Sequence, residues 1–151
     1  MGMFTALTTS ASGLSAQRLR MDAIADNLAN VNTTRTDHGG PYRRKIAVFG
    51  PIPNQGVAES PFLPNVLKPR TGQGVRVTAI EESDKPFNMV YNPHHPDRIQ
   101  EGKWKDHVAM PNVNIVEEMV DMISASRAYE ANIAVIQDGK SMFTKALDIA
   151  R

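Results

Sequence analysis

Hydrophobic residues in the first 32 positions recur at alternating steps of three and four. Within this series Leu7, Leu14, Met21 and Leu28 are seven residues apart, a spacing that keeps side chains on one seam of a slightly supercoiled helix. Asn30 begins a run rich in Asn and Thr, which are weak helix formers because their side chains hydrogen-bond nearby backbone groups. We therefore predict a long N-terminal helix over residues 1–32.

A second amphipathic series fills residues 111–151. Pro111 prevents a helix from entering from upstream, and Asn114 with Glu117 three residues later is typical of a helix start. Gly139 lies inside the series, where glycine costs about 1 kcal/mol relative to alanine. The apolar positions again step by three and four, which predicts a C-terminal helix with one broad apolar face. That face includes Met119, Ile133, Ile136, Phe143 and Leu147.

Residues 33–110 differ in composition from both ends, because they hold nine of the ten Pro and seven of the ten Gly. Three short runs, 43–49, 74–80 and 87–91, have the alternation or the β-branched and aromatic content of strands. Residues 50–70 contain five Pro and are predicted to form an irregular loop. The chain as a whole is therefore predicted to be α+β, with long terminal helices that pair as a coiled coil and a small, β-rich, Pro- and Gly-rich middle segment.

The overall composition narrows the functional classes. The 151 residues include 17 Lys and Arg against 16 Asp and Glu, so no strong net field favours nucleic acid or an anionic membrane. The absence of Cys excludes disulfides, zinc–thiolate sites and cysteine nucleophiles, and no apolar run approaches the roughly 20 residues of a membrane span. The N-terminus lacks the basic segment and continuous apolar stretch of a secretory signal peptide, so we expect a chain made without one.

The two apolar stripes allow two arrangements. A stripe of about 30 residues is roughly 45–50 Å long, and the middle segment is too small to cover both. The helices pair either as an antiparallel hairpin in a monomer or as parts of a subunit that packs mainly against other copies. Exposed apolar area of this extent usually marks an interface, and head-to-tail contacts between unlike faces build open helical polymers.

His94, His95, Asp97 and His107 are the best candidates for chemistry, as ligands of a metal ion. The two adjacent histidines are flanked by Pro, so their side chains diverge, and the turn interpretation is favoured. We predict no catalytic, cofactor-binding or metal-binding residues. A small metal-dependent enzyme using His94, His95 and His107 stays as a remote alternative.

Several stretches resemble the bacterial flagellar basal-body rod protein family. They are Ala-Ser-Gly-Leu at 11–14, Asp-Ala-Ile-Ala-Asp-Asn-Leu-Ala-Asn-Val-Asn-Thr-Thr at 22–34, Gly-Gly-Pro-Tyr-Arg-Arg-Lys at 39–45, Ala-Met-Pro-Asn-Val-Asn at 109–114, Glu-Met-Val-Asp-Met-Ile at 118–123 and Ser-Arg-Ala-Tyr-Glu-Ala-Asn at 126–132. Tyr-Asn-Pro at 91–93 and His-Pro-Asp at 95–97 resemble the proximal-rod members in particular.

The resemblance implies a structural subunit of the flagellar proximal rod, not an enzyme and without a cofactor. The rod is a hollow drive shaft that crosses the periplasm, transmits motor torque and conducts exported subunits. Family members leave the cytoplasm through the flagellar type III export apparatus without a cleaved signal peptide. They polymerise through terminal helices, here 1–32 and 111–151, with 33–110 outside. Another flagellar axial protein, of the rod or hook type, is the alternative.

The same resemblance predicts the partners and the contact residues. The partners are other copies of the chain, other rod proteins, adjoining basal-body components and the export apparatus, with no nucleic acid and no direct membrane span. The axial-core contacts are predicted at Leu7, Leu14, Met21, Leu28, Met119, Ile133, Ile136, Phe143 and Leu147.

Overall fold

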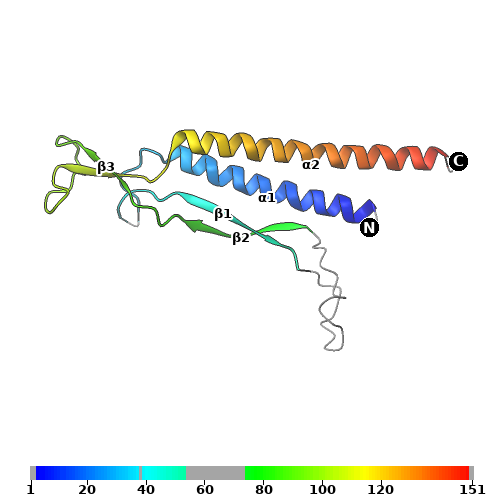
Figure 1. Ribbon diagram of the computed structural model, residues 1–151, viewed down its shortest axis with the longest axis horizontal. Helices are drawn as coiled ribbons and strands as arrows, with labels where there is room; N and C mark the ends of the chain where they lie inside the picture. The colour runs from blue at the N-terminus through cyan, green and yellow to red at the C-terminus, as the bar shows by residue number, and fades with distance from the viewer. Residues whose placement is uncertain (1–2, 38, 54–73, 150–151) are drawn as a thin grey trace, which may run out of the picture.

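A computed structural model describes residues 3–37, 39–53 and 74–149. Helix α1 (Met3–Ala29) and helix α2 (Ile115–Ile149) run antiparallel and side by side along the long axis of the molecule (Figure 1). Between them in sequence come four strands, β1 (Lys45–Pro51), β2 (Val75–Glu82), β3 (Asn88–Tyr91) and β4 (His107–Met110). The predicted α+β class with paired terminal helices is confirmed. Within the described ranges, neither helix combines the length and the hydropathy that a membrane span requires.

Helix α1 ends where Asn30 forms local hydrogen bonds with its side chain and its backbone. The Asn30 side-chain amide donates to the Asp26 carbonyl at 2.9 Å, and the backbone N–H of Thr33 donates to the Asn30 carbonyl at 3.0 Å. These local bonds substitute for the next helical turn. The helix therefore ends at Ala29, three residues before position 32.

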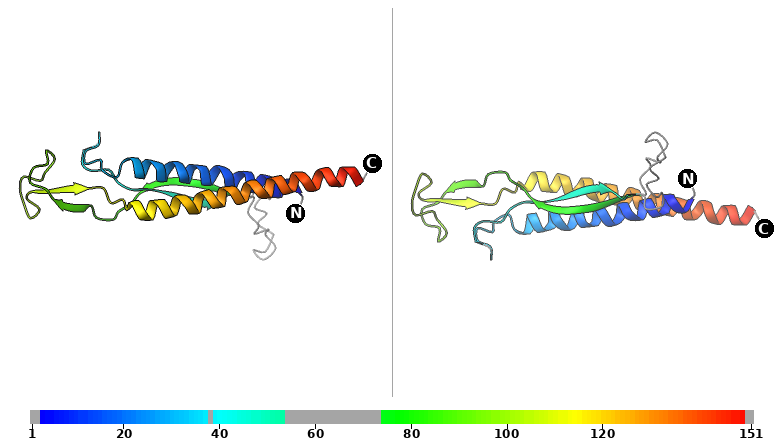
Figure 2. Two further views of the ribbon diagram at one scale, coloured as in Figure 1. Left: turned by 90° about the horizontal axis from the view of Figure 1, so that it is seen from above. Right: turned by 90° about the horizontal axis from the view of Figure 1, so that it is seen from below.

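Helix α2 starts as the sequence predicts. The side-chain oxygen of Asn114 accepts the N–H of Val116 at 3.0 Å, and its carbonyl accepts the N–H of Glu118 at 3.0 Å, which is the geometry of an N-cap. With 35 residues against 27, α2 is the longer helix. Its C-terminal end extends past the start of α1 (Figures 1 and 2).

Strands β1 and β2 form an antiparallel hairpin that lies along α1 (Figure 2). The register runs from Lys45 opposite Glu82 to Pro51 opposite Val75, with one irregularity between Val48 and Phe49. The predicted alternation of β2 is confirmed, because its residues are half-buried and exposed in turn up to residue 80. Residues 54–73, most of the predicted 50–70 loop, lie outside the described residues.

Strands β3 and β4 form a second antiparallel hairpin beyond the end of the pair where α1 stops and α2 begins (Figure 1). Strand β3 was expected from the sequence, but β4 was not. Its four residues, His-Val-Ala-Met, are too few for a period to register, and its conformation depends on pairing with β3. Asp106, just before it, turns the chain with a φ of 62°.

Little of the molecule is buried. Among the described residues few apolar side chains are buried, and half of them are alanines: Ala16, Ala23, Ile24, Tyr42, Val108 and Ala125. Many of the larger apolar side chains of both helices remain exposed instead. The arrangement of those side chains is what defines the candidate site.

Candidate functional site

Residues on one face of helix α1 recur every seven positions, and three such faces can be distinguished. The first contacts the β1–β2 hairpin, the second contacts α2, and the third lies next to the second on the side away from the hairpin. The Ser12 hydroxyl accepts the N–H of Val75 in the hairpin at 3.1 Å, and Gly13 lies against Asn132 of α2. Leu14, one residue or about 100° further around the helix, is half-buried. The same order recurs at Leu19, Arg20 and Met21 and at Asp26, Asn27 and Leu28.

The seam between the two helices is narrow and lined by small residues. A Cβ placed on Gly13 would come within 3.1 Å of the Asn132 side chain, and one on Gly139 within 3.2 Å of Leu7. Ala125 is fully buried. Gly139, which the sequence suggested only as a weak point of the helix, therefore has a packing reason, because its missing side chain lets the helices approach closely.

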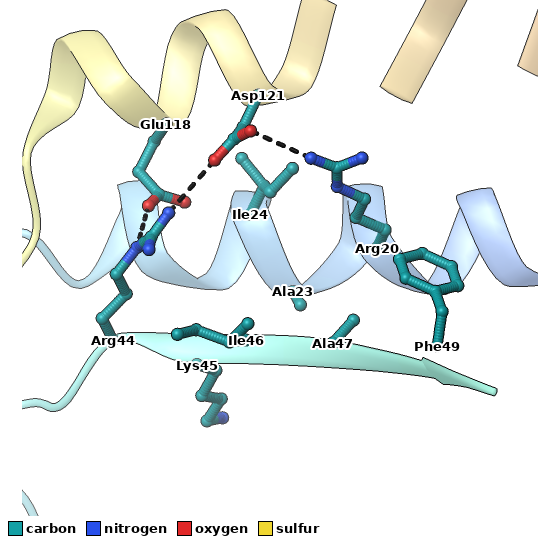
Figure 3. Close-up of a pocket in the computed structure, with 10 residues that line it drawn as sticks. All are labelled: Arg20, Ala23, Ile24, Arg44, Lys45, Ile46, Ala47, Phe49, Glu118 and Asp121. Atoms are coloured by element: carbon teal, nitrogen blue, oxygen red, sulfur yellow. Dashed lines mark hydrogen bonds and ion pairs between the residues drawn. The ribbon is translucent and has the colours of Figure 1, made fainter. Parts of the chain in front are cut away.

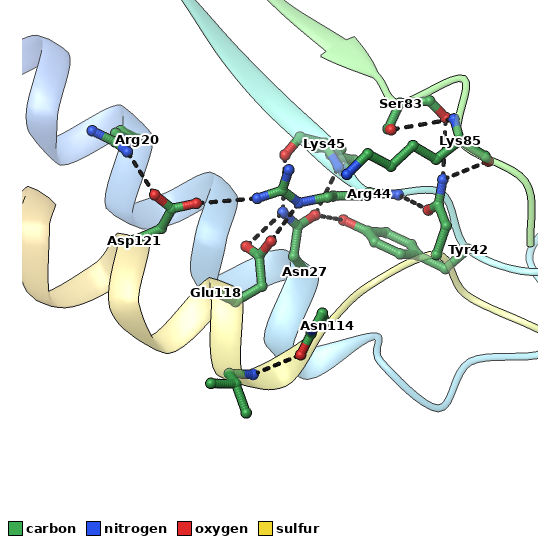
Figure 4. Close-up of polar contacts among 12 residues, drawn as sticks. Arg20, Asn27, Tyr42, Arg44, Lys45, Ser83, Lys85, Asn114, Glu118 and Asp121 are labelled. Atoms are coloured by element: carbon green, nitrogen blue, oxygen red, sulfur yellow. Dashed lines mark hydrogen bonds and ion pairs between the residues drawn. The ribbon is translucent and has the colours of Figure 1, made fainter. Parts of the chain in front are cut away.

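A buried polar cluster joins α1, α2 and β1 near the start of α2 (Figure 4). Glu118 is fully buried, and its carboxylate accepts hydrogen bonds from the Asn27 amide at 3.0 Å and from the Arg44 guanidinium. Asn27 is 1% exposed, and its side-chain amide makes all four of the hydrogen bonds that are open to it. Its amide donates to Glu118 and to the Lys45 carbonyl, while its oxygen accepts from the Lys45 N–H and the Tyr42 hydroxyl. The Asn27 side chain therefore pairs with the backbone of Lys45 in the way that a peptide group of a neighbouring strand would.

An ion-pair chain extends the cluster toward the surface. Arg44 reaches Asp121 at 3.1 Å, and Asp121 in turn accepts from Arg20 of α1 at 2.9 Å. Burial lowers the pKa of Arg44, but its hydrogen bond with Glu118 and the nearby carboxylates raise that pKa above its ordinary value. Burial, followed by the charges of nearby carboxylates, raises the pKa of Tyr42 to about 12. Both groups therefore keep their protons at physiological pH.

An open groove of about 300 Å³ lies beside this chain, between α1, α2 and β1. Figure 3 shows Arg44, Asp121 and Arg20 linked across one side, with Ile46, Ala47 and Phe49 of β1 along the other. The groove's two carboxylates are both paired with arginine. The groove therefore has the character of a packing surface rather than of a catalytic pocket.

The predicted axial-core residues lie beside the seam or outside it. Leu7 contacts Gly139 across the seam. Leu14, Met21 and Leu28 each follow by one residue a position that faces α2, which places them on the third face of α1. By degree of burial, Leu7, Leu14, Met21, Ile133 and Ile136 are half-buried, and Leu28, Met119, Phe143 and Leu147 are exposed.

The two most C-terminal of these residues lie at the overhanging end of α2. Phe143 and Leu147 follow Gly139, which faces Leu7, at steps of four, so they continue the side of α2 that packs on α1. Helix α2 continues past the start of α1 here (Figure 1). The two side chains are 44% and 54% exposed, so the α1-facing side of α2 is left open at this end.

The start of α2 carries a second exposed apolar face. Val116, Met119, Val120 and Ile123 are spaced as one face of a helix and are between 53% and 68% exposed. Glu118, Asp121 and Ala125 lie on the other side of the same helix, toward α1. An apolar strip of this size on a helix surface indicates a contact surface.

The rings of His95 and His107 have partners at the second hairpin, and the backbone N–H of His94 donates to the Asn92 side chain at 3.3 Å. The His107 ring packs edge-on against Tyr91 and Trp104, and the backbone N–H of Asp97 donates to the His95 ring at 3.1 Å. Across the described parts of the chain, no group of three His, Asp or Glu side chains is placed to hold a metal ion.

The sequence interpretation missed the polar cluster. Asn27, Arg44 and Glu118 are 17 and 74 positions apart along the chain, so no local motif joins them. A signal was nevertheless present, since Gly13 and Asn27 on α1, and Glu118 and Gly139 on α2, are spaced at multiples of seven. Those positions define the contacting face of each helix.

Comparison with known proteins gives consistent matches over the whole chain. Residues 7–35 match the family model described as "Flagella basal body rod protein", and residues 106–149 match "Flagellar basal body rod FlgEFG protein C-terminal". The chain is 54% identical over 149 residues to the flagellar basal-body rod protein FlgC of Borreliella burgdorferi, covering 99% of this chain and 98% of that one. It is 41% identical to FlgC of Bacillus subtilis and 37% identical to FlgC of Salmonella typhimurium, with both chains of each pair covered in full.

Proposed function

This chain belongs to the flagellar basal-body rod protein family, and from that premise we propose that its exposed helix faces join it to neighbouring rod subunits. The chain is a structural subunit of the flagellar proximal rod, located in the flagellar basal body, and not an enzyme. It assembles with other rod and basal-body proteins. The proposal concerns which surfaces make that assembly.

The proposed contacts are those of an axial core. They comprise Leu7, Leu14, Met21, Leu28, Met119, Ile133, Ile136, Phe143 and Leu147, and the neighbours are other copies of this chain and other rod proteins. Burying one such exposed side chain contributes roughly 1.5–3 kcal/mol. Many contacts of this size give the stiffness that torque requires, because close-packed surfaces deform little.

The proposed division of the chain follows from the same faces. Residues 1–32 and 111–151 form the axial helices, and residues 33–110 form the outer segment. The chain leaves the cytoplasm through the flagellar type III export apparatus without a cleaved signal peptide. The assembled rod crosses the periplasm as a hollow shaft through which later subunits pass.

The observation that carries the proposal is the exposed apolar surface of the two helices. Val116 is 68% and Met119 54% exposed, and Phe143 and Leu147 lie open at the overhanging end of α2. The faces on α1 and α2 are unlike one another, and contacts between unlike faces extend into a helical polymer instead of closing as a dimer. An open polymer is what a rod requires.

Charged substitutions at half-buried positions of both helices test the proposal. Leu14→Asp and Ile133→Asp replace half-buried apolar side chains with carboxylates that a packed interface cannot solvate. We expect both variants to be made and exported but to abolish rod assembly and swimming. Motility in soft agar, electron microscopy of basal bodies and immunoblots of cell fractions measure these outcomes.

The matched control is Gln100→Asp, which adds the same carboxylate at an exposed position outside both helices. We expect this variant to swim as the parent does. Circular dichroism of each purified variant establishes that helix content is retained. Normal swimming of both Leu14→Asp and Ile133→Asp would contradict the axial-core assignment.

A further inference from the structure

The close approach at Gly13 does not by itself fix how far α2 slides along α1, although the fit of Leu7 against Gly139 favours the observed register. Ala125, Asn132 and Gly139 are seven residues apart on the side of α2 that packs on α1. Gly13 has no side chain, so it fits by size opposite Ala125 or Gly139 as well as opposite Asn132. A shift of one heptad, about 10 Å, would therefore meet no steric barrier at Gly13.

The polar cluster is satisfied in only one of these registers. In the observed register the fully buried Glu118 carboxylate receives donors from both Asn27 and Arg44. A shift of one heptad would bring Asn27 opposite Ala125, or move it beyond the start of α2 at Ile115. Glu118 would then lose both Asn27 and Arg44 as donors: one slip brings it opposite Arg20, and the other moves it past the end of α1 at Ala29. Either slip also separates the half-buried Arg44 from Glu118, so the network of three paired residues is lost, which is unfavourable.

We propose that Asn27, Arg44 and Glu118 act as a register key that selects one stagger of α2 on α1. A single buried polar contact is known to specify the register of paired helices whose apolar seam alone would permit several. Arg44 also links the β1–β2 hairpin to this register, because it directly precedes β1 and contacts both Glu118 and Asp121 of α2.

The key sets how far the end of α2 extends past α1. A slip of one heptad would lengthen or shorten this overhang by about 10 Å and move Phe143 and Leu147 with it. The consequence for rod assembly rests on the proposed function, whereas the register itself is a property of the single chain. The two can therefore fail separately.

Paired cysteines report the register directly, because the natural sequence contains no Cys. The pair Gly13→Cys with Asn132→Cys reports the observed register, in which a Cβ at Gly13 lies 3.1 Å from the Asn132 side chain. Gly13→Cys with Ala125→Cys, and Gly13→Cys with Gly139→Cys, report slips of one heptad in either direction. A disulfide requires Cα atoms within about 7 Å, so each pair is specific for its register.

The test compares these pairs in the full-length purified chain with and without the key. In the parent background we expect the observed-register pair to cross-link at least about tenfold more than either slipped pair. Replacing the key by Asn27→Leu, Arg44→Met and Glu118→Leu removes the whole polar set, a change that buried clusters often tolerate. We expect the slipped pairs then to approach the observed-register pair within about threefold.

The matched control replaces exposed groups on the same two helices by Arg18→Met, Glu130→Leu and Gln137→Leu, with the same change in charge. We expect it to retain the parent's preference. The proposal is overturned if the variant without the key cross-links only in the observed register. It is equally overturned if the parent already forms slipped pairs freely, or if the control slips as much.

A second variant keeps the test decisive if the triple replacement loses its helical signal. Arg20→Met with Asp121→Leu removes only the half-exposed end of the ion-pair chain. We expect the fraction of slipped cross-links to rise about threefold, because Arg44 loses one of its two acceptors. An unchanged ratio in this variant would overturn the proposal.

Discussion

The inside and the outside of the helix pair differ in the size and polarity of their side chains. Most residues between α1 and α2 are small or polar, with Ala125 and Glu118 fully buried and Asn27 1% exposed, and Leu7 packs there against Gly139. On the outside, Val116 is 68% and Met142 60% exposed. A helical hairpin that folds for itself places its large apolar residues between the helices. Here the seam provides close approach, and the large apolar side chains on the outside form the surfaces that we propose to contact neighbouring subunits.

The comparison predicts that the largest loss of stability comes from the polar inside. Glu118→Ala leaves the Arg44 guanidinium and the Asn27 amide without their buried acceptor. We expect the free energy of unfolding to fall by about 3–5 kcal/mol, as when one partner of a buried ion pair is removed. Urea unfolding followed by circular dichroism measures it.

Glu130→Ala is the control, because it removes an exposed carboxylate of the same helix, away from both its first turn and the cluster. Its expected effect is within about 0.5 kcal/mol. Equal losses for the two variants would mean that the buried cluster contributes no more than a surface charge.

The sequence revealed the outside of the pair better than the inside. Apolar positions at steps of three and four predicted both helices, because apolar periodicity is a local signal. The assignment of Leu14, Met21 and Met119 to the axial core stays a prediction. The inside depends on contacts between distant segments. Glu118 is buried because Arg44 and Asn27 reach it, and no pattern within one helix reveals donors supplied by another.

The β segments divide in the same way. Strand β2, with eight residues, shows its alternation in sequence, whereas β4 has only four residues and forms against β3. A strand so short is defined by its partner, not by its own composition.

Alkaline pH sharpens the comparison, because Tyr42 belongs to the polar inside. Its pKa is raised from 10.0 to about 12, first by burial and then by nearby carboxylates. Below pH 10 the hydroxyl is protonated in both states. Between pH 10 and about 12 the unfolded chain loses this proton while the folded chain keeps it, so the free energy of unfolding falls with rising pH by about 2 kcal/mol.

Tyr42→Phe has no such group, so we expect a shallower loss of stability over the same pH range. Unfolding curves of both proteins at several pH values between 9 and 12 give the two slopes. Parallel slopes would contradict the raised pKa, whatever the absolute stabilities.

The closeness of the seam predicts a smaller effect. Gly13→Leu adds a side chain where even a Cβ would lie 3.1 Å from Asn132. We expect the helices to be forced apart at a cost of about 1–2 kcal/mol, measured as a lower urea midpoint. Ala11→Leu, an exposed position on the same helix, is the matched control. If Gly13→Leu proved as stable as this control, the helices would not be in close contact at Gly13.

The smallest expected effect on stability comes from the outside, where the effect on assembly is expected to be large. Met119→Asp changes a side chain that is 54% exposed and lies on the solvent-facing side of α2. We expect the free energy of unfolding of the monomer to change by no more than about 0.5 kcal/mol. The same carboxylate, buried without a partner at a subunit contact, would prevent packing, so we expect rod assembly and swimming to be lost.

Ser124→Asp is the matched control, since it places the same carboxylate at an exposed polar position of α2. We expect it to leave both stability and swimming unchanged. Met119→Asp and Glu118→Ala then distinguish the outside from the inside at adjacent positions, because the first is expected to affect assembly and the second to lower the stability of the chain. Swimming by Met119→Asp cells at the rate of Ser124→Asp cells would mean that this outer apolar face makes no contact in the rod. Its exposed methionine and valines would then need another explanation.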